Sequence, residues 1–340
     1  MNKIIDILYS KNNISEEGLH SILLSDDTNY LFEMANKKRI ENFNNRVILR
    51  GLIEFSNYCS NNCYYCGLQC SNRNIKRYAL TKEEILQCCQ KGYDEGLHSF
   101  VLQSGESTYY SVKEFSEILK DIKREFKDIV ITLSIGEKSY DEYLTYYKSG
   151  AERFLLRFET SDSSHYEYLH PKEMSLKNRM TCLKNLKDIG YQTGTGFMVG
   201  SPNQTVENLV KDVLFLKELQ PHMVGIGPFI PQQDTIFANE KAGSVDLVLK
   251  LIAIIRLLLP NTLIPATTAL RTLNPNSLEK ALNVGANVMM PNLSPDFAKE
   301  NYKIYDEKET KSDISNLVAF LKSIGYTANL SRGDHPDFIS

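Results

Sequence analysis

Four cysteines within twelve residues are the feature of this sequence that first calls for a chemical explanation. The segment NYCSNNCYYCGLQC carries Cys59, Cys63, Cys66 and Cys70 with the spacing C-x3-C-x2-C-x3-C. Thiolates this close along a chain can converge on one metal centre. A structural zinc ion held by all four sulfurs is one interpretation, and an iron–sulfur cluster held by some of them is another. Four unrelated free thiols are the third.

The composition is that of an ordinary globular chain. Of its 340 residues, 42% are hydrophobic and 24% are charged, and the formal net charge is -3. This balance gives no sign of a nucleic-acid partner or an acidic membrane partner. No apolar run reaches the roughly 18 residues that a membrane span needs, and the N-terminus has no signal-peptide core. We therefore expect a cytoplasmic protein whose seven cysteines are not disulfide-bonded.

Beyond residue 45 the sequence repeats one unit: an amphipathic helix, a glycine, and a short apolar strand. The glycines suit the left-handed position that ends a helix. The strands are apolar, as strands buried on both faces are. We expect eight strands, at residues 47–55, 98–103, 129–134, 152–158, 192–199, 222–226, 262–266 and 285–290. This pattern predicts an α/β fold, a (β/α)8 barrel of the TIM type.

A doubly wound open sheet is the competing fold. No glycine-rich dinucleotide fingerprint follows the first strand, which favours the barrel. We expect residues 1–45 to form an N-terminal helical extension and residues 46–310 to form the barrel. Residues 311–340 are expected to form a C-terminal helix and a tail packed on it. The cysteine loop then follows the first strand at the barrel mouth, which is an unusual place for structural zinc.

Active sites of such barrels lie at the carboxyl ends of the strands, so polar residues that follow strands are candidates. Gln103, Ser104, Gly105 and Glu106 follow the second strand, and Gly105 would let the backbone approach a ligand closely. Taken alone, this segment could also be an ordinary turn.

Arg157 and Glu159 are two residues apart in the run RFET, so alternation along a strand puts them on one face. Arg179 opens the helix before the fifth strand, and arginine grips carboxylates through two hydrogen bonds. Together these groups would cradle a zwitterion, although a structural ion pair is an alternative. Thr267 and Thr268 add hydroxyls after the seventh strand, or serve β-structure only. Tyr302 follows the eighth strand, where packing is the plainer role.

The spacing C-x3-C-x2-C, with Tyr65 before the last cysteine, matches the signature of radical S-adenosylmethionine (SAM) enzymes. This resemblance implies a 4Fe-4S cluster held by Cys59, Cys63 and Cys66, with one iron left open for SAM. A fourth thiolate would close that position, so Cys70 is expected to be a free thiol. The resemblance also implies that Gln103, Gly105 and Glu106 bind SAM.

The sequence further resembles the HydE family, radical SAM maturases of iron–iron hydrogenase. The resemblance runs from Arg50 to Asn292 through the segments IEFSNYCSNNCYYCGL, KRYALTKEEI, VLQSGE, LLRFET, GFMVGSPNQT, MVGIGPFIPQQDT, IPATTAL and GANVMMPN. It implies that Ser134, Glu159 and Arg179 contact SAM. It implies that Arg157, Thr267 and Thr268 hold the carboxylate of a cysteine-derived substrate, with Tyr302 near that cavity.

The same resemblance implies partners. The substrate would be an iron–carbonyl–cyanide cysteine complex made by HydG, and the GTPase HydF would receive later products. A reductant protein such as flavodoxin or ferredoxin would supply electrons.

Two features depart from the family pattern. No cysteine follows Cys182, which excludes the second cluster that some members carry near the C-terminus and removes support for a biotin synthase activity. Arg271 stands where a small residue is expected, near the substrate carboxylate or pointing to solvent. A paralogue with another substrate, or a methylornithine-synthase-like isomerase acting on lysine, therefore stays open. Such an isomerase would need a carboxylate at the cavity wall to bind the second amine of its substrate. A zinc-stapled binding protein is the non-enzyme alternative.

Overall fold

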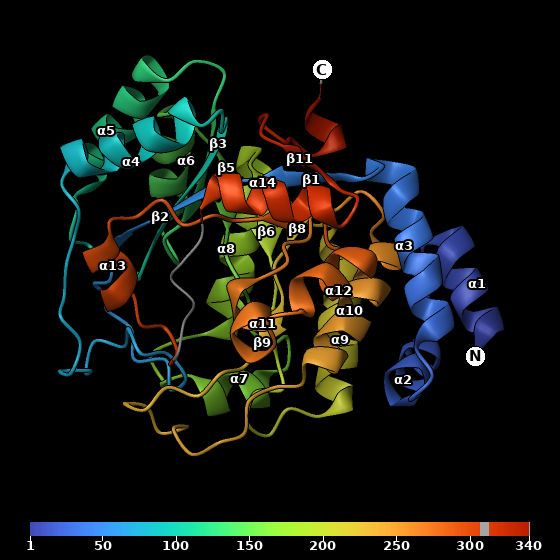
Figure 1. Cartoon of the computed structure of the whole chain (residues 1–340). Coiled ribbons are helices and arrows are strands. Elements are labelled where there is room, and N and C mark those ends of the chain that lie inside the picture. Colours follow the sequence, from blue (N-terminus) through green and yellow to red (C-terminus); the bar gives the residue numbers. More distant parts are fainter. Residues whose placement is uncertain (307–312, 340) are drawn as a thin grey trace.

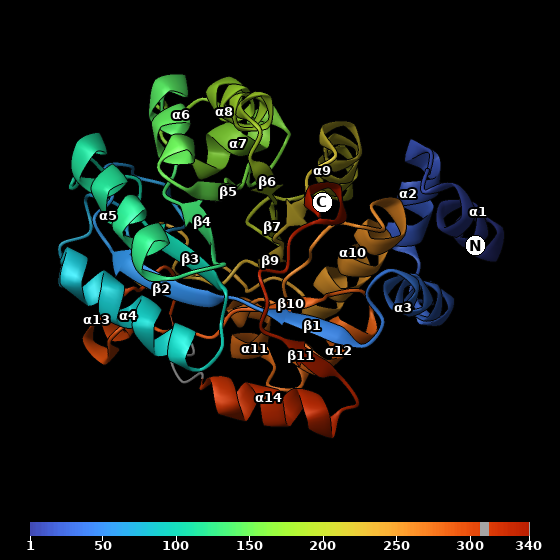
Figure 2. The same ribbon diagram turned by 90° about the horizontal axis from the view of Figure 1, so that it is seen from above.

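The computed structural model describes residues 1–306 and 313–339. The domain boundary expected at residues 310 and 311 lies outside the described residues. The structure is an α/β fold in which helices cover the outer face of a curved parallel sheet (Figures 1 and 2). The three N-terminal helices stand together at one edge, and the chain's C-terminal end lies at the opposite end of the molecule from the cysteine loop (Figure 1).

Three helices precede the first strand. They are α1 (Asn2–Lys11), α2 (Glu16–Leu24) and α3 (Asn29–Phe43). These helices pack on α9 (Val206–Leu219) and α10 (Val245–Leu258). Helix α10 is apolar around most of its circumference because it lies between the sheet and α3.

The regular part of the sheet has six parallel strands in the order β2-β3-β4-β5-β6-β8. They are β2 (Gly51–Ser56), β3 (Ser99–Ser104), β4 (Val130–Ser134), β5 (Ala151–Leu155), β6 (Gln192–Thr195) and β8 (Met223–Val224). A three-stranded sheet places β1 (Arg46–Leu49) between β10 (Val288–Met289) and β11 (Thr327–Asn329). A small pair joins β7 (Met198–Val199) and β9 (Gly227–Pro228).

Between β8 and β2 the strands are connected by isolated β-bridges and short pairings rather than by long regular strands. Met223 bridges to Leu263, and Pro265 bridges to Val288 of β10. Strand β10 pairs with β1, and β1 continues into β2. The strand predicted at 262–266 is therefore present only as bridges, since Pro265 has no N–H to donate to a ladder.

Other strands differ from the expected bounds for local reasons. The strand predicted at 47–55 divides at Arg50, where its neighbour changes from β11 to β3. The strand predicted at 192–199 divides at Gly196, where a Cβ atom would lie 1.9 Å from the carbonyl oxygen of Gly225. The strand predicted at 285–290 is shortened to β10.

Helices between the strands form the outer layer (Figure 2). They are α4 (Lys82–Asp94), α5 (Val112–Glu125), α6 (Tyr140–Lys148), α7 (Ser163–Leu169), α8 (Leu176–Ile189), α11 (Thr268–Leu273), α12 (Ser277–Asn283), α13 (Asp296–Asn301), α14 (Ile314–Ser323) and the 3-10 turn Pro336–Phe338. Capping boxes begin α4, α5 and α6, because Ser or Thr is followed three residues later by Glu. None of the described helices has the length and apolar character that crossing a bilayer requires.

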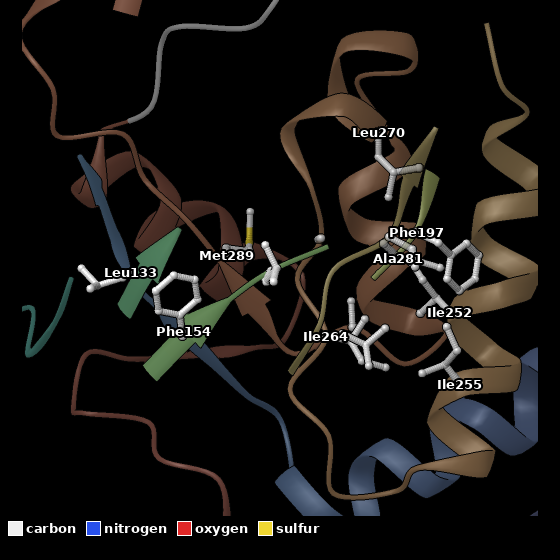
Figure 3. Packing of buried hydrophobic residues seen from close by; sticks show 14 of the residues in the cluster. Leu133, Phe154, Phe197, Ile252, Ile255, Ile264, Leu270, Ala281 and Met289 are labelled. Carbon is white, nitrogen blue, oxygen red and sulfur yellow. The ribbon is translucent and has the colours of Figure 1, made fainter. Parts of the chain in front are cut away.

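The hydrophobic core lies between the sheet and these helices (Figure 3). Leu133 and Phe154 come from neighbouring strands, and Ile252 and Ile255 come from α10; all four are fully buried. Phe154 also meets the ring of Tyr143 edge to face, with centroids 5.0 Å apart. This packing fixes the strands whose carboxyl ends carry the candidate site.

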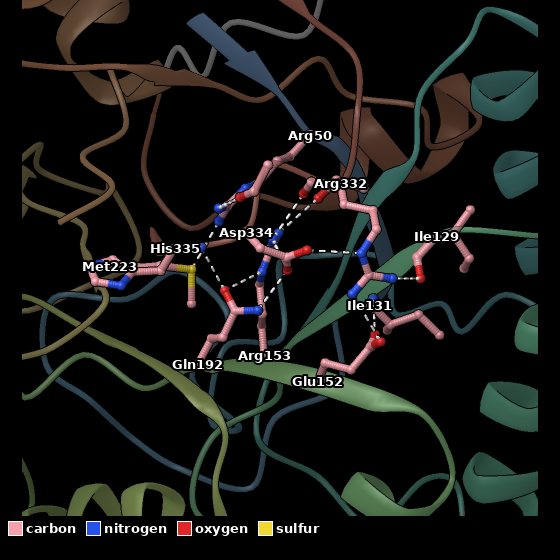
Figure 4. A network of polar contacts seen from close by, with 12 residues as sticks. Arg50, Ile129, Ile131, Glu152, Arg153, Gln192, Met223, Arg332, Asp334 and His335 are labelled. Atoms are coloured by element: carbon pink, nitrogen blue, oxygen red, sulfur yellow. Dashed lines mark hydrogen bonds and ion pairs between the residues drawn. The ribbon is translucent and has the colours of Figure 1, made fainter. Parts of the chain in front are cut away.

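The C-terminal tail lies against the amino-terminal end of the sheet, where it enters a network of polar contacts (Figure 4). Buried Arg153 of β5 donates to Gln192 Oε1 at 3.1 Å, to Ser99 Oγ at 3.1 Å and to Asp334 Oδ1 at 2.7 Å. Arg332 donates to the other oxygen of Asp334 at 2.8 Å. Burial opposes ionisation, but these cations and Gln192 hold the pKa of Asp334 below its usual value.

Candidate functional site

The cysteine loop follows β2 at the carboxyl end of the sheet. Cys59, Cys63 and Cys66 are half-buried free thiols. Burial raises the pKa of all three, to about 12 for Cys66, and the neighbouring cysteines raise the pKa of Cys63 further. The three sulfurs therefore lie close enough to repel one another when ionised, which a shared metal centre would relieve.

Strand β3 anchors the start of this loop. The Ser60 N–H donates to the Glu106 carbonyl at 2.7 Å, and the Gly105 N–H donates to the Ser56 carbonyl at 3.3 Å. A Cβ atom on Gly105 would lie 2.4 Å from the carbonyl oxygen of Tyr58. The close approach that the sequence predicts at Gly105 is thus made by the cysteine loop itself.

Cys70 differs from the other three cysteines of the loop. It is exposed, and its Sγ lies 3.3 Å from Asn62 Oδ1. Its backbone N–H donates to the Asn61 carbonyl at 2.8 Å. The expectation that Cys70 is a free thiol when a cluster is bound stays a prediction.

Tyr65 points to a histidine that sequence reasoning missed. Its hydroxyl lies 3.2 Å from His170 Nε2, and His170 Nδ1 lies 2.9 Å from the Tyr166 carbonyl. Because Nδ1 faces an acceptor, it carries the hydrogen, so Nε2 accepts from Tyr65. Burial lowers the pKa of His170 to about 3, which keeps the ring neutral. His170 thereby holds the Tyr65 ring in place beside the loop.

Glu106 turns its carboxylate toward the loop after β4. Its Oε2 accepts from the Glu137 N–H at 2.7 Å and lies over Gly136, where an added Cβ atom would meet it at 2.2 Å. Gly136 also has a left-handed φ of 77°, which favours glycine. Ser134, at the end of β4, is the register partner of Gln103.

Arg179 of α8 is held by Glu137. Its Nε lies 2.6 Å from Glu137 Oε1, and its Nη1 donates to the Arg157 carbonyl at 3.2 Å. Burial opposes the charge, but Glu137 raises the pKa of Arg179 above its usual value. Glu137 follows a predicted strand and was therefore a candidate, but its pairing with Arg179 was not predicted, since nothing in its local sequence links it to an arginine 42 positions later.

Arg157 and Glu159 lie together, but not through strand alternation. Strand β5 ends at Leu155, and Glu159 adopts a left-handed φ of 67°, which is uncommon outside glycine. The Arg157 Nη2 atom lies 2.9 Å from Glu159 Oε2. The predicted strand over 152–158 is therefore too long, although the predicted pairing of the two side chains is present.

Arg157 Nε and Thr267 Oγ1 are among the buried polar atoms that have no hydrogen-bond partner within the described residues, and Thr132 Oγ1, in the middle of β4, is another. Thr267 immediately precedes α11, and Thr268 is that helix's first residue. Buried polar atoms in proteins almost always have partners. A hydroxyl and a guanidinium left in this state, those of Thr267 and Arg157, fit a bound carboxylate.

A second set of polar contacts joins β3 to Tyr302, which follows α13, and β2 to Asn292, which precedes α13. Gln103 Nε2 lies 3.2 Å from the Tyr302 hydroxyl. Asn292 Nδ2 donates to Glu54 Oε2 at 2.9 Å. Burial, and then Glu54, raise the pKa of Tyr302 well above its usual value. The chain thus brings Tyr302 to the candidate site through Gln103 and places a buried carboxylate, Glu54, nearby.

Arg271 lies apart from this group. It belongs to α11 and lines a cavity of about 780 Å³ between helices, with Lys91, Leu278, Lys299 and Phe320 among its walls. None of the predicted site residues lines that cavity.

The residues present fit the two groups that the sequence implies. Three neighbouring thiols and an exposed fourth match three-cysteine ligation of a cluster with one open iron. Paired carboxylates and arginines beside unpartnered hydroxyls match the amino and carboxylate groups of SAM and of an amino-acid-like substrate.

The fold and the thiol loop together define a cluster-binding barrel. Residues 53–216 match the family model described as the radical SAM superfamily. Because relatives at 30% identity or more cover most of it, this chain belongs to the radical SAM superfamily and is an enzyme of that type. The superfamily uses a 4Fe-4S cluster and SAM, which favours the cluster over structural zinc.

Individual members of the superfamily are similar to this chain over most of its length. The [FeFe] hydrogenase maturase subunit HydE of Thermotoga maritima is 46% identical over 278 residues, which cover 82% of this chain and 79% of the relative. The 3-methylornithine synthase of Methanosarcina acetivorans is 33% identical over 319 residues, which cover 92% and 89%. The crystal structure of methylornithine synthase (PylB) superposes with a TM-score of 0.85 at 30% identity, covering 96% of this chain and 97% of that one.

Proposed function

We propose that this chain is a HydE-type maturase of iron–iron hydrogenase. The similarity to HydE at 46% identity over most of both chains carries the proposal. The ion pair of Arg157 with Glu159, the buried unpartnered hydroxyl of Thr267 and the contact of Tyr302 with Gln103 support it, since these residue types suit an amino-acid-like substrate. The reaction would take place in the cytoplasm, on a cysteine-derived iron complex supplied by HydG, with HydF as the later acceptor.

In this proposal Cys59, Cys63 and Cys66 hold a 4Fe-4S cluster and Cys70 does not. When bound, the cluster supplies one electron that breaks a carbon–sulfur bond of SAM, giving methionine and a 5′-deoxyadenosyl radical. The electron comes in turn from a protein such as flavodoxin or ferredoxin. The half-buried position of the three thiols limits the access of water to this step.

The surrounding residues bind and orient SAM. Glu106 and Glu159 offer carboxylate oxygens to an amino group, and Arg179 offers guanidinium nitrogens to a carboxylate. Gln103, Gly105 and Ser134 would also contact SAM. Tyr65, within the cysteine loop, would pack next to it. Arg157 Nε, Thr267 Oγ1 and the Thr268 hydroxyl would bind the substrate carboxylate, with Tyr302 nearby.

The test of the substrate uses the anaerobically reconstituted protein, which should bind about four irons per chain. With SAM and a reductant it should form 5′-deoxyadenosine, and the cysteine–iron complex made by HydG should increase that rate. If deoxyadenosine forms and the complex changes nothing, the chemistry stands and the substrate assignment fails.

A methylornithine-synthase-like isomerase acting on lysine is the second candidate. The buried carboxylate of Glu54, 2.9 Å from Asn292 Nδ2, favours it, because a diamino acid needs a carboxylate for its second amine. Incubation with lysine, followed by chromatography of the derivatised amino acids, tests it. An isomer has the same mass as lysine, so separation rather than mass decides the result.

A further inference from the structure

Arg77, which none of the roles above uses, lies beneath the cysteine loop. It belongs to the segment that follows the loop and is half-buried. Its Nη1 donates to the carbonyls of Asn57 at 2.6 Å and Leu68 at 3.0 Å. Its Nη2 donates to the carbonyls of Gln69 at 2.7 Å and Asn72 at 3.3 Å. One of these carbonyls precedes the first cluster cysteine and three follow the last.

A single guanidinium therefore connects the two ends of the cysteine loop. The loop has little regular structure, so its carbonyl groups need partners from elsewhere. A guanidinium suits this task because its planar fork carries five N–H donors. A lysine ammonium has three donors and cannot reproduce the four contacts.

The backbone on either side of Arg77 is itself fixed to the end of β2. The Tyr78 N–H donates to Asn57 Oδ1 at 2.8 Å, and Asn57 Nδ2 donates to the Lys76 carbonyl at 2.8 Å. Ala79 forms an antiparallel bridge with Ser56. The guanidinium is thus held by the sheet, and the loop is held by the guanidinium.

The charge of Arg77 lies at the two ends of the cysteine loop. Among the described residues, its guanidinium nitrogens donate to backbone carbonyls and not to a carboxylate. The accepting residues Asn57 and Leu68 each stand two positions along the chain from a cluster cysteine, Cys59 and Cys66. A positive charge in this place would favour the more negative, reduced state of a cluster held by the loop.

We propose that Arg77 is a positioning residue for the cluster, which ties the two ends of the cysteine loop together and raises the reduction potential through its charge. This inference rests on the proposed binding of a cluster by Cys59, Cys63 and Cys66. It gives the segment KRYAL, which the sequence singled out without a role, a physical task.

Three variants separate the two parts of the proposal. Arg77→Gln removes both the charge and most of the hydrogen bonds, whereas Arg77→Lys keeps the charge and loses the fork. Arg73→Gln is the matched control, because Arg73 is an exposed arginine of the same loop. Each protein is reconstituted anaerobically. Iron release to a chelator is timed, and the midpoint potential is measured by redox titration followed by electron paramagnetic resonance.

We expect Arg73→Gln to behave as the unaltered protein. Arg77→Gln should release iron about 10- to 100-fold faster, the usual cost of losing a supporting contact at a metal site, and should have a more negative potential. Arg77→Lys should release iron faster with a potential close to that of the unaltered protein. A protease should also cut the iron-free Arg77→Gln protein within residues 57–77 sooner than the iron-free unaltered protein.

Unchanged iron release and potential in Arg77→Gln would overturn the inference while leaving the proposed function intact. If Arg77→Gln does not fold, unchanged iron release in Arg77→Lys would overturn it instead. Failure of the unaltered protein to bind iron would count against the proposed function itself, so the two failures are distinguishable.

Discussion

Two arginines four residues apart show how the two ends of this barrel differ. Arg153, toward the amino-terminal end, donates to Gln192, Ser99, Asp334 and the Arg332 carbonyl. Arg157, at the cysteine-loop end, has one carboxylate partner, and its buried Nε has none among the described residues. In barrels of this kind, residues at the amino-terminal end serve stability and those at the carboxyl end serve catalysis.

The contrast extends beyond the two arginines, with exceptions. Thr267, which precedes α11, also keeps a buried hydroxyl without a partner among the described residues, whereas the C-terminal tail supplies partners to Arg153 and Gln192. Two exceptions are Arg50, whose buried Nε lacks a partner although its Nη2 donates to the Gly333 carbonyl at 3.3 Å, and Asn287, whose buried Nδ2 lacks a partner just before β10. The tail thus supplies partners to Arg153 and Gln192, whereas Arg157 Nε and Thr267 Oγ1 keep none among the described residues.

The largest effect on stability is expected at Arg153. Arg153→Met breaks a buried, multiply bonded ion pair and should lower the free energy of unfolding by about 3–5 kcal/mol. Arg157→Met, the matched variant at the other end, should change it by less than about 1 kcal/mol. Chemical denaturation measures both, and a larger loss for Arg157→Met would break the comparison.

Asp212 of α9 should make stability depend on pH. Its Oδ1 accepts from the Ser161 N–H at 2.5 Å, its Oδ2 is buried without a partner among the described residues, and burial raises its pKa to about 7. The folded state therefore favours the protonated acid. That contribution is complete below about pH 4 and is lost as the pH rises through about 7.

Asp212→Asn should remove this dependence, flattening the change in unfolding free energy between pH 4 and 8 by up to about 4 kcal/mol. Asp141→Asn, at an exposed position, is the control. Identical pH profiles for the Asp212→Asn and unaltered proteins would show that the carboxyl is ionised normally.

Arg157→Lys should lower substrate-stimulated deoxyadenosine formation about 10- to 100-fold, because a hydrogen bond to a charged group contributes about 1.5–3 kcal/mol and lysine cannot present the same fork. Stability should stay within about 1 kcal/mol of the unaltered protein. Full activity in this variant would show that Arg157 Nε does not bind the substrate.

The smallest effect is expected at Thr267. Thr267→Val removes a hydroxyl that has no hydrogen-bond partner among the described residues, so stability should not fall, while substrate-stimulated turnover should drop about three- to tenfold. Steady-state kinetics and thermal unfolding, measured together, decide this. A loss of stability without a loss of turnover would place the hydroxyl among the structural groups.

The sequence predicts the parts of this site that are local. Cysteine spacing, the Gly-Glu pair after β3 and the paired Arg157 and Glu159 can be read from neighbouring residues. The partners Glu137 for Arg179 and His170 for Tyr65 cannot, because separate elements bring them together. The bridges around Pro265 were overestimated as a strand, because the apolar run was given more weight than the proline, which has no N–H to donate to a ladder. The stabilising role of the C-terminal tail was underestimated. The contact between Asp334 and Arg153 joins residues far apart in the sequence, so it appears only in the folded structure.

The most direct test of the whole account compares Cys63→Ala with Cys70→Ala after anaerobic reconstitution. We predict that Cys63→Ala lacks the brown colour and forms no 5′-deoxyadenosine from SAM, whereas Cys70→Ala retains both. Undiminished SAM cleavage in Cys63→Ala, or its loss in Cys70→Ala, would contradict ligation by three cysteines.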